Sequence, residues 1–245
     1  MNKSALFSKK YTHIFFDLDN TLWDFNRNSK SAMQEAFDFY RLNMQADFEK
    51  FFDIYTEYNH QLWALYRNNE VGKKELTRLR FQNTFEDLNI SGVDPEKMNE
   101  TYLNVMPKQT FLNQGASELL QYLKSKKYQL FVITNGFKEV QYNKIKTSSL
   151  KPFFQKVFVS EEIKTPKPGR EIFEYAVKSS NAKKSKSIMV GDDWETDILG
   201  AVNFGIDAIH FLNDSKIEFN RLQTEINTNQ NIFQSGTLLQ MLSSF

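Results

Sequence analysis

Cysteine is absent from the 245 residues of this chain, and histidine, proline and glycine are scarce, with 3, 5 and 9 residues respectively. Without cysteine there is no disulfide, no thiol nucleophile and no thiolate ligand for zinc. The histidines His13, His60 and His210 are too scattered in the sequence to predict a zinc site. Zinc is therefore disfavoured as a cofactor.

Long hydrophobic runs and an excess of one charge are missing too. No apolar run approaches the roughly 20 residues of a transmembrane helix, and the opening MNKSALFSKKY lacks the apolar core of a signal peptide. The chain has 31 Lys and Arg against 30 Asp and Glu, a net charge of +1. This balance gives no reason to expect a membrane or a nucleic acid polymer as partner. We expect a cytoplasmic protein, either a monomer or a homodimer.

Short apolar strands alternate with helices over much of the chain. The apolar runs predict strands at 11–17, 129–134, 156–160, 187–192 and 207–211. Helical spacing between them predicts helices such as 170–180 and 195–204, while the polar tail after Asn213 predicts only a final helix around 238–242. Near-continuous apolar strands that alternate with helices are typical of a parallel sheet covered on both faces. The predicted fold class is α/β, with a doubly wound, Rossmann-like sheet.

A long helical segment interrupts this alternation after the first strand. Apolar residues recur at helical spacing from Met33 to Val105, and no strand is predicted before Tyr128. Connections in α/β units usually take about 2–6 residues, so a segment this long should be a module of its own. We predict a discontinuous core domain of residues 1–22 and 111–245, with an all-helical cap domain, residues 23–110, inserted into it.

Polar residues follow the predicted strands at their carboxyl ends, where open α/β sheets bind ligands. They are Asp17 and Asp19, Thr134 and Asn135, Lys167, and Asp192 and Asp193. Each short motif alone is more typical of a turn or a helix cap than of a functional site. Their common position at one edge of the sheet favours a single site.

The aspartates at this edge predict a magnesium site. Asp17 and Asp19 are two residues apart, so in extended backbone their side chains leave on the same side. Like charges that close repel unless a cation lies between them, and Asp192 adds a further negative charge. Oxygen ligands with waters suit Mg²⁺, which typically binds one or two carboxylates together with phosphate oxygens.

An acidic metal site beside phosphate-binding groups predicts phosphoryl transfer from a small phosphorylated metabolite. Lys167 offers a positive charge to a phosphate, and Thr134 and Asn135 offer hydroxyl and amide donors. One aspartate can attack phosphorus to form an aspartyl-phosphate, while another protonates the leaving oxygen and then activates water. The residue types alone leave open which aspartate has which role.

Four motifs resemble those of the haloacid-dehalogenase-like hydrolase superfamily, in the same order. They are DLDNT at 17–21, ITNG at 133–136, KPGREIF at 167–173 and GDDWETD at 191–197. The helical insert resembles that superfamily's C1-type cap. Lys164 lies close to the third motif, but the motif lysine is the one followed by proline, which is Lys167. The resemblance implies a phosphatase that forms an aspartyl-phosphate and uses Mg²⁺.

The resemblance also implies a role for each site residue. Asp17 would be the nucleophile and Asp19 the general acid and base, with Thr134 and Lys167 binding phosphate. The carboxylates of Asp17 and Asp192 and the backbone carbonyl of Asp19 would hold Mg²⁺. Asp193 and Asp197 would contact and orient these metal ligands without binding the ion themselves. An aspartate at position 19 favours a phosphatase over a dehalogenase, because a departing alkoxide needs a proton and a halide does not.

The substrate is less sharply indicated than the reaction. The stretch DLDNTLWDF and the size of the insert resemble the pyrimidine nucleoside 5′-monophosphatases. Aromatic side chains can stack on bases, and the candidates are Trp23, Phe25, Trp63 and Tyr66. The same aromatics could instead pack the cap's own core. A phosphoglycolate or sugar-phosphate phosphatase, or a mutase, is the alternative enzyme. A phospho-acceptor regulatory protein is the non-enzyme alternative, which the helical insert and Asp19 disfavour.

Overall fold

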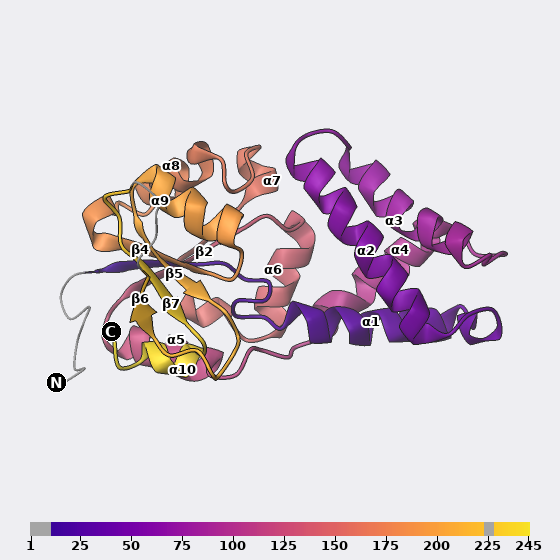
Figure 1. Ribbon diagram of the computed structural model, residues 1–245, viewed down its shortest axis with the longest axis horizontal. Helices are drawn as coiled ribbons and strands as arrows, with labels where there is room; N and C mark the ends of the chain where they lie inside the picture. The colour runs from indigo at the N-terminus through magenta and orange to yellow at the C-terminus, as the bar shows by residue number, and fades with distance from the viewer. Residues whose placement is uncertain (1–10, 223–227) are drawn as a thin grey trace. The chain divides into compact units, whose positions relative to one another are not determined.

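The computed structural model describes residues 11–222 and 228–245, and it divides into two compact units (Figure 1). One unit contains the described residues up to Phe25 together with those from Thr110 onward. The other unit is Asn26–Gln109. The first is built around a β-sheet and the second is helical. Within the described residues, no helix combines the length and the apolar character needed to cross a membrane.

The sheet unit is organised around seven strands in the order β3-β2-β1-β4-β5-β7-β6. Their bounds are β1 His13–Phe16, β2 Gln129–Thr134, β3 Lys156–Val159, β4 Ser187–Gly191, β5 Asp207–Phe211, β6 Asn220–Arg221 and β7 Ile232–Ser235. All neighbouring strands are parallel except β6, which runs antiparallel to β7. The doubly wound, mostly parallel sheet predicted from the sequence is confirmed.

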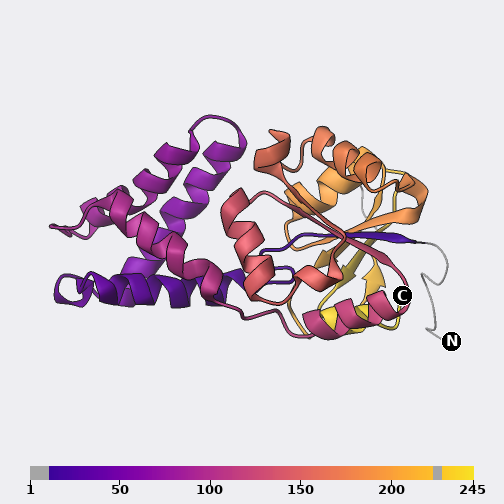
Figure 2. The ribbon, with the colours of Figure 1, turned by 180° about the vertical axis from the view of Figure 1, so that it is seen from behind.

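Helices cover both faces of this sheet. The helices of the unit are α5 Ala116–Ser125, α6 Lys138–Thr147, α7 Ser160–Ile163, α8 Arg170–Ser179, α9 Gly200–Phe204 and α10 Leu238–Met241, with 3₁₀ turns η3 Lys151–Phe153 and η4 Lys184–Lys186 and a π-helical segment η5 Trp194–Leu199. Figures 1 and 2 show α5 and α10 on one side of the sheet, and α8 and α9 on the other. Coverage of both faces explains why the central strands are apolar at almost every position.

The register of the central strands aligns their carboxyl ends. Phe16, the last residue of β1, pairs with Val132 of β2 on one side and with Val190 of β4 on the other. Asp17 continues this line, since its backbone N–H donates to the Val190 carbonyl at 2.9 Å. The buried strand therefore delivers Asp17 to the edge of the sheet beside the ends of two other strands.

The helical unit contains α1 Phe25–Phe39, α2 Phe48–Arg67, α3 Lys73–Asp87 and α4 Pro95–Val105, with 3₁₀ turns η1 Leu42–Met44 and η2 Met106–Lys108. Side-chain caps start two of these helices: Asp47 accepts from the Lys50 N–H, and Asp94 accepts from the Glu96 N–H. Aromatic side chains from α2, α3 and α4 pack together in the core of this unit. The unit thus buries an apolar core of its own.

The structure departs from the sequence-based prediction in two places. The sequence predicts only a final helix after Asn213, but β6 and β7 also lie there, and β7 extends the parallel sheet beside β5. The segment IFQS of β7 is too short and too mixed in polarity to stand out, and its pairing with β5 makes it a strand. The helix predicted at 195–204 is a π-helical segment followed by α9.

Candidate active site

The loop after β1 carries the two aspartates of the first motif. Its turn is closed by backbone hydrogen bonds from Leu22 and Trp23 to the Leu18 carbonyl. Asn20 has a φ of 60°, which asparagine tolerates better than most residues. The buried amide of Asn113 donates to the Asn20 and Thr21 carbonyls at 2.6 and 3.0 Å. These bonds hold Asp17 and Asp19 in a defined loop, and the sequence offered no sign that Asn113 takes part.

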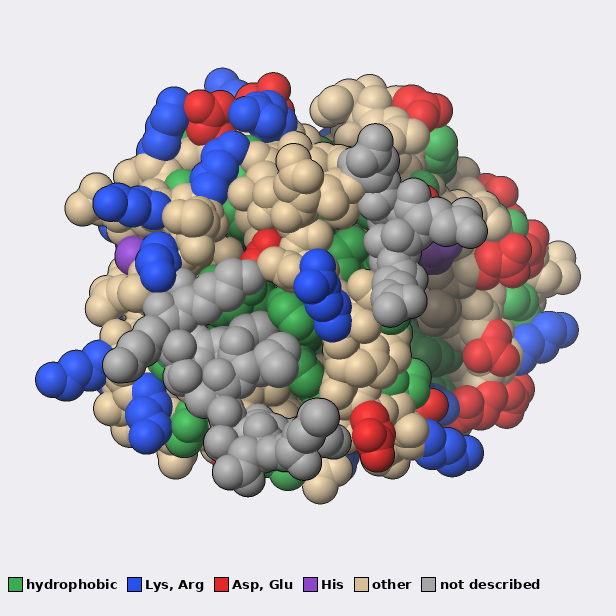
Figure 3. All heavy atoms as spheres, turned by 60° about the vertical axis from the view of Figure 1, so that its left-hand side comes forward, with side chains coloured by type: hydrophobic (Ala, Val, Ile, Leu, Met, Phe, Trp, Pro, Cys, Tyr) green, Lys and Arg blue, Asp and Glu red, His purple; other side chains and the backbone are tan. Residues whose placement is uncertain are grey.

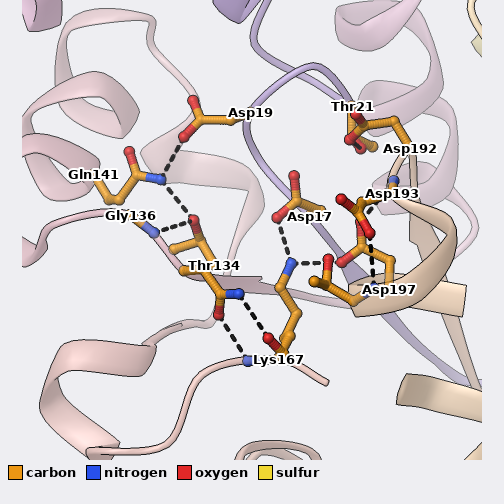
Figure 4. A network of polar contacts seen from close by, with 12 residues as sticks. Asp17, Asp19, Thr21, Thr134, Gly136, Gln141, Lys167, Asp192, Asp193 and Asp197 are labelled. Atoms are coloured by element: carbon orange, nitrogen blue, oxygen red, sulfur yellow. Dashed lines mark hydrogen bonds and ion pairs between the residues drawn. The ribbon is translucent and has the colours of Figure 1, made fainter. Parts of the chain in front are cut away.

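Lys167 lies between two buried carboxylates, as Figure 4 shows. Its Nζ is 2.5 Å from Asp17 Oδ1 and 2.5 Å from Asp197 Oδ1. Burial lowers the pKa of Lys167, but the two aspartates more than offset this effect, so its pKa lies above the ordinary value. Lys167 is therefore a cation, and it links the strand β1 motif to the segment after β4.

Asn135 holds the backbone of Lys167. Its side-chain N–H donates to the Lys167 carbonyl at 2.9 Å, and its Oδ1 accepts from the Lys167 N–H at 2.8 Å. This pair of bonds places Lys167 beside the end of β2. Phosphate binding by Asn135 itself stays a prediction.

Three carboxylates converge at the carboxyl ends of β1 and β4. Oxygens of Asp17, Asp192 and Asp197 lie within 4.8 Å of one another. Asp192 Oδ1 also accepts from the Thr21 hydroxyl at 2.9 Å. A Cβ on Gly191 would overlap the Asp197 carboxyl group, so glycine is needed here for close approach. The cluster places three carboxyl groups close to the ammonium of Lys167.

Burial makes ionisation of this cluster costly. It raises the pKa of Asp17 and of Asp192 to about 7, and that of Asp197 to about 6. Lys167 lowers all three values, but burial and the neighbouring aspartates outweigh it. All-oxygen donors with uncompensated negative charge are what a hard divalent cation such as Mg²⁺ requires. The residues present therefore fit a magnesium ion.

Asp193 supports the cluster through the backbone. Its carboxylate accepts from the Thr196 N–H at 2.8 Å and so caps η5, and its own N–H donates to Asp197 Oδ2 at 3.2 Å. Beside it, His210 Nε2 lies 2.9 Å from the Asp192 carbonyl oxygen. Burial lowers the pKa of His210. Asp193 and His210 thus hold the backbone around the carboxylates of Asp192 and Asp197.

Thr134 and Asp19 meet at Gln141, a residue that the sequence analysis missed. Gln141 Nε2 donates to Thr134 Oγ1 at 2.6 Å and to Asp19 Oδ2 at 2.8 Å (Figure 4). The Thr134 oxygen also accepts from the Gly136 N–H at 3.3 Å, so its hydroxyl hydrogen is left to donate elsewhere. This is the donor that a phosphate oxygen requires.

Lys144 is the second residue that the sequence analysis missed. Its Nζ lies 2.7 Å from Asp19 Oδ1, and the lysine side chain is buried. Burial lowers the pKa of Lys144, and the contact with Asp19 acts in the opposite direction. Gln141 and Lys144 are three residues apart on α6 and so share one helix face. A lysine on a polar helix is normally solvated, so nothing in the sequence around Lys144 indicates that it is buried beside Asp19.

Two of the aromatic candidates for base stacking lie next to Lys144. Its Nζ is 4.3 Å from the ring centroid of Trp23 and 5.3 Å from that of Phe25. Trp23 is fully buried, and its indole N–H donates to Ser148 Oγ at 3.1 Å. This position favours packing under Lys144 over base stacking for Trp23.

The other two candidates, Trp63 and Tyr66, belong to α2 of the helical unit. Their rings meet edge to face with centroids 5.5 Å apart, and both are partly exposed. Their contact with a substrate stays a prediction.

Comparisons with known proteins show the family to which the chain is similar. A family described as haloacid dehalogenase-like hydrolase matches residues 14–211. The chain is 35% identical over 198 residues to pyrimidine 5′-nucleotidase YjjG of Escherichia coli (strain K12), a match that covers 80% of this chain and 84% of that protein. It is 32% identical over 203 residues to glyceraldehyde 3-phosphate phosphatase of Pyrococcus furiosus, and this match covers 81% of this chain and 79% of that protein.

The fold has close counterparts among solved structures. The structure of YfnB from Bacillus subtilis matches with a TM-score of 0.81 at 24% identity, over 95% of this chain and 97% of that one. This likeness supports a shared fold: a Rossmann-like core with a helical cap.

Proposed function

Because this chain belongs to the haloacid dehalogenase-like hydrolase family, we propose that it is a magnesium-dependent phosphomonoester hydrolase that forms an aspartyl-phosphate. One observation carries the proposal. Lys167 bridges Asp17 and Asp197 within a cluster of three carboxylates, of which Asp17 and Asp197 are buried and Asp192 is partly exposed. The Thr134 oxygen already accepts two hydrogen bonds, so its hydroxyl hydrogen can donate to a substrate. A nucleophilic carboxylate, a fixed cation and a neutral donor at one sheet edge are the groups that phosphoryl transfer needs.

The proposed reaction has two steps. Lys167 engages Oδ1 of Asp17, which leaves Oδ2 to attack phosphorus. The bond between phosphorus and the leaving oxygen breaks as Asp19 gives that oxygen a proton. Asp19 then takes a proton from a water that attacks the phosphorus of the aspartyl-phosphate. Inorganic phosphate leaves, and the Asp17 carboxylate is restored.

Other side chains bind the transferred group. Lys167 and Thr134 face the phosphoryl oxygens, and Asn135 positions Lys167 through the two bonds to its backbone. The carboxylates of Asp17 and Asp192 and the backbone carbonyl of Asp19 would hold Mg²⁺, supported by Asp193 and Asp197. When bound, the ion neutralises charge on the phosphoryl oxygens.

We propose a nucleoside 5′-monophosphate, a pyrimidine one first, as the substrate. The identity to a pyrimidine 5′-nucleotidase over most of both chains supports this choice. The identity to a glyceraldehyde 3-phosphate phosphatase favours small phosphorylated metabolites as the second candidate. The net charge of +1 supports a small partner over a nucleic acid polymer, and both acidic and basic side chains are visible on the face shown in Figure 3. The cytoplasmic location and the monomer or homodimer stay predictions.

Phosphate release from a panel of monoesters tests the proposal. The panel contains pyrimidine and purine nucleoside 5′-monophosphates, phosphoglycolate, glyceraldehyde 3-phosphate, hexose phosphates and p-nitrophenyl phosphate, each with Mg²⁺ and with EDTA. We expect activity only with Mg²⁺, with Ca²⁺ a poor substitute because it takes more ligands at longer distances. Uridine or thymidine 5′-monophosphate should have the highest kcat/KM. Activity in EDTA would contradict the metal requirement, and a different leading substrate would contradict the nucleotidase assignment alone.

A further inference from the structure

Helix α6 supplies hydrogen-bond donors to both carboxylate oxygens of Asp19. Lys144 Nζ lies 2.7 Å from Oδ1, and Gln141 Nε2 lies 2.8 Å from Oδ2. The three-residue spacing of Gln141 and Lys144 places both donors on one face of the helix. Since each carboxylate oxygen can accept about two hydrogen bonds, each oxygen of Asp19 keeps one site for a substrate. The carboxylate is fixed in orientation without being blocked.

Both donors are themselves held in place. Gln141 also donates to Thr134 Oγ1 at 2.6 Å, so it ties Asp19 to the end of β2. A Cβ on Gly136 would overlap the Gln141 amide, so the glycine of the ITNG motif leaves room for it. Lys144 lies against the rings of Trp23 and Phe25, which attract a cation through their π faces. These contacts restrict the motion of both side chains.

A buried lysine is costly where structure alone is at stake. Desolvation of an ammonium is expensive, and an apolar side chain of the same length would fill this space without that cost. The contacts of the Lys144 ammonium are Asp19 and two aromatic rings. Because the buried ammonium of Lys144 carries this desolvation cost and contacts Asp19, we infer that it serves the function of Asp19.

We propose that Gln141 and Lys144 are positioning residues for Asp19, the general acid and base of the reaction. This inference rests on the proposed function, because it assigns the two residues to the proton-transfer step. They hold the Asp19 carboxyl group so that it faces the leaving oxygen, and Trp23 and Phe25 form the surface on which Lys144 rests. A small misplacement of a reacting group can slow a reaction greatly, so loss of either donor should slow proton transfer.

The test compares two leaving groups in Lys144→Met and Gln141→Leu. An alkyl phosphate needs a proton on its leaving oxygen, whereas p-nitrophenolate leaves without one. We use uridine 5′-monophosphate, or the best alkyl phosphate of the panel, and p-nitrophenyl phosphate. General acid–base catalysis contributes about 10²–10⁴-fold, so loss of positioning should lower kcat/KM for the alkyl ester about tenfold or more. The aryl ester should lose much less.

A double-mutant cycle separates this role from direct contact with substrate. In the Asp19→Asn background, Lys144→Met should cause no further loss of kcat/KM, because the group that it positions has gone. An equal loss in both backgrounds would mean that Lys144 acts on the substrate itself, and it would overturn the proposal. If Lys144→Met fails to fold, Gln141→Leu and its double variant answer the same question without removing a charge.

Glycine substitutions provide an independent check. Gly136→Ala should displace Gln141 and produce the same preference for the aryl ester. Gly72→Ala is the matched control, since a Cβ at Gly72 meets nothing within 4 Å, and it should behave as wild type. Equal losses for both leaving groups in the Lys144, Gln141 and Gly136 variants would refute positioning of Asp19. An inactive wild-type enzyme would instead refute the proposed function, so the two failures are distinguishable.

Discussion

The ammonium of Lys167 lies 2.5 Å from carboxylate oxygens of both Asp17 and Asp197, and all three side chains are buried. Such a group acts on stability and on chemistry together. The Lys167 ammonium offsets part of the repulsion between the aspartates, and it fixes one oxygen of Asp17, the proposed nucleophile. Removal of one partner from a buried charge network leaves the others uncompensated. At the scale of single residues, stability and activity of this site are therefore coupled.

Lys167→Met should lower the free energy of unfolding by about 3–5 kcal/mol near neutral pH and abolish phosphate release. The loss of stability should be smaller at about pH 5, because the buried aspartates can then take up protons. Urea unfolding at both pH values measures this. Lys164→Met is the matched control, since Lys164 is exposed and close in sequence, and it should change neither quantity. A stable, active Lys167→Met variant would remove Lys167 from the site.

Asp17→Asn should abolish turnover without unfolding the protein. The amide has nearly the same shape and can still accept from Lys167, but it cannot attack phosphorus. Burial already raises the pKa of Asp17 to about 7, so loss of its charge should leave the melting temperature unchanged or higher. Phosphate release and thermal unfolding are the measurements, with the exposed Asp53→Asn as control. Retained turnover in Asp17→Asn would disprove the nucleophile assignment.

At the scale of elements, the parallel sheet brings acidic residues that follow different strands together at the carboxyl ends of these strands. β1 and β4 are adjacent and in register, so the residues that follow them, Asp17 and Asp192, are brought together by the sheet. The π-helical segment η5 after β4 then adds Asp197 to the same cluster. The sheet geometry thus gathers carboxylates of the kind that the proposed Mg²⁺ site needs.

Mg²⁺ should stabilise the protein more at about pH 8 than at about pH 5. The three aspartates have pKa values raised to about 6–7 in the fold, against about 3.9 for a free aspartate. At pH values between the pKa of a free aspartate and the raised pKa in the fold, the metal-free folded protein binds more protons than the unfolded chain. The contribution of this cluster to the free energy of unfolding therefore falls as pH rises. Mg²⁺ binds the ionised form and offsets that fall.

Thermal unfolding with and without Mg²⁺ at the two pH values measures this effect. Asp192→Asn should reduce the Mg²⁺-dependent shift in melting temperature. A shift that is equal at both pH values, or unchanged in Asp192→Asn, would contradict a metal site at this cluster.

At the scale of the whole molecule, the chain divides its work between two units. In the proposed reaction, the sheet unit carries the reacting groups, from β1 to η5, and these groups would bind the phosphoryl group that every monoester has in common. The helical unit Asn26–Gln109 has its own core and carries none of the proposed catalytic groups. We therefore predict that discrimination between leaving groups comes from the helical unit.

Trp63→Ala should reduce kcat/KM for the preferred nucleotide if the base stacks on this ring. The reduction should correspond to a loss of about 1–3 kcal/mol of transition-state stabilisation. Turnover of p-nitrophenyl phosphate should fall much less, because that substrate has no base. Phe39→Ala is a control from the same unit, since Phe39 is an exposed aromatic. Equal effects on both substrates would show that Trp63 supports the structure of the unit and does not select the substrate.

The sequence by itself determined the fold class and the position of the candidate site. Apolar strands that alternate with helices specify a parallel sheet, and the polar residues after Phe16, Ile133 and Gly191 must then lie at one edge. Burial on both faces leaves such strands few other arrangements. These features depend on local periodicity, which is visible in a single sequence.

Only the tertiary structure decided which partners the charged residues have. Lys144 is 125 positions from Asp19, and Gln141 is 122 positions from it. On α6 they look like ordinary surface residues, because helix periodicity records which residues share a face but not what that face meets. The strand β7 depends in the same way on its pairing with β5. The physical reason is that the energies of buried ion pairs and strand pairs come from contacts between distant segments.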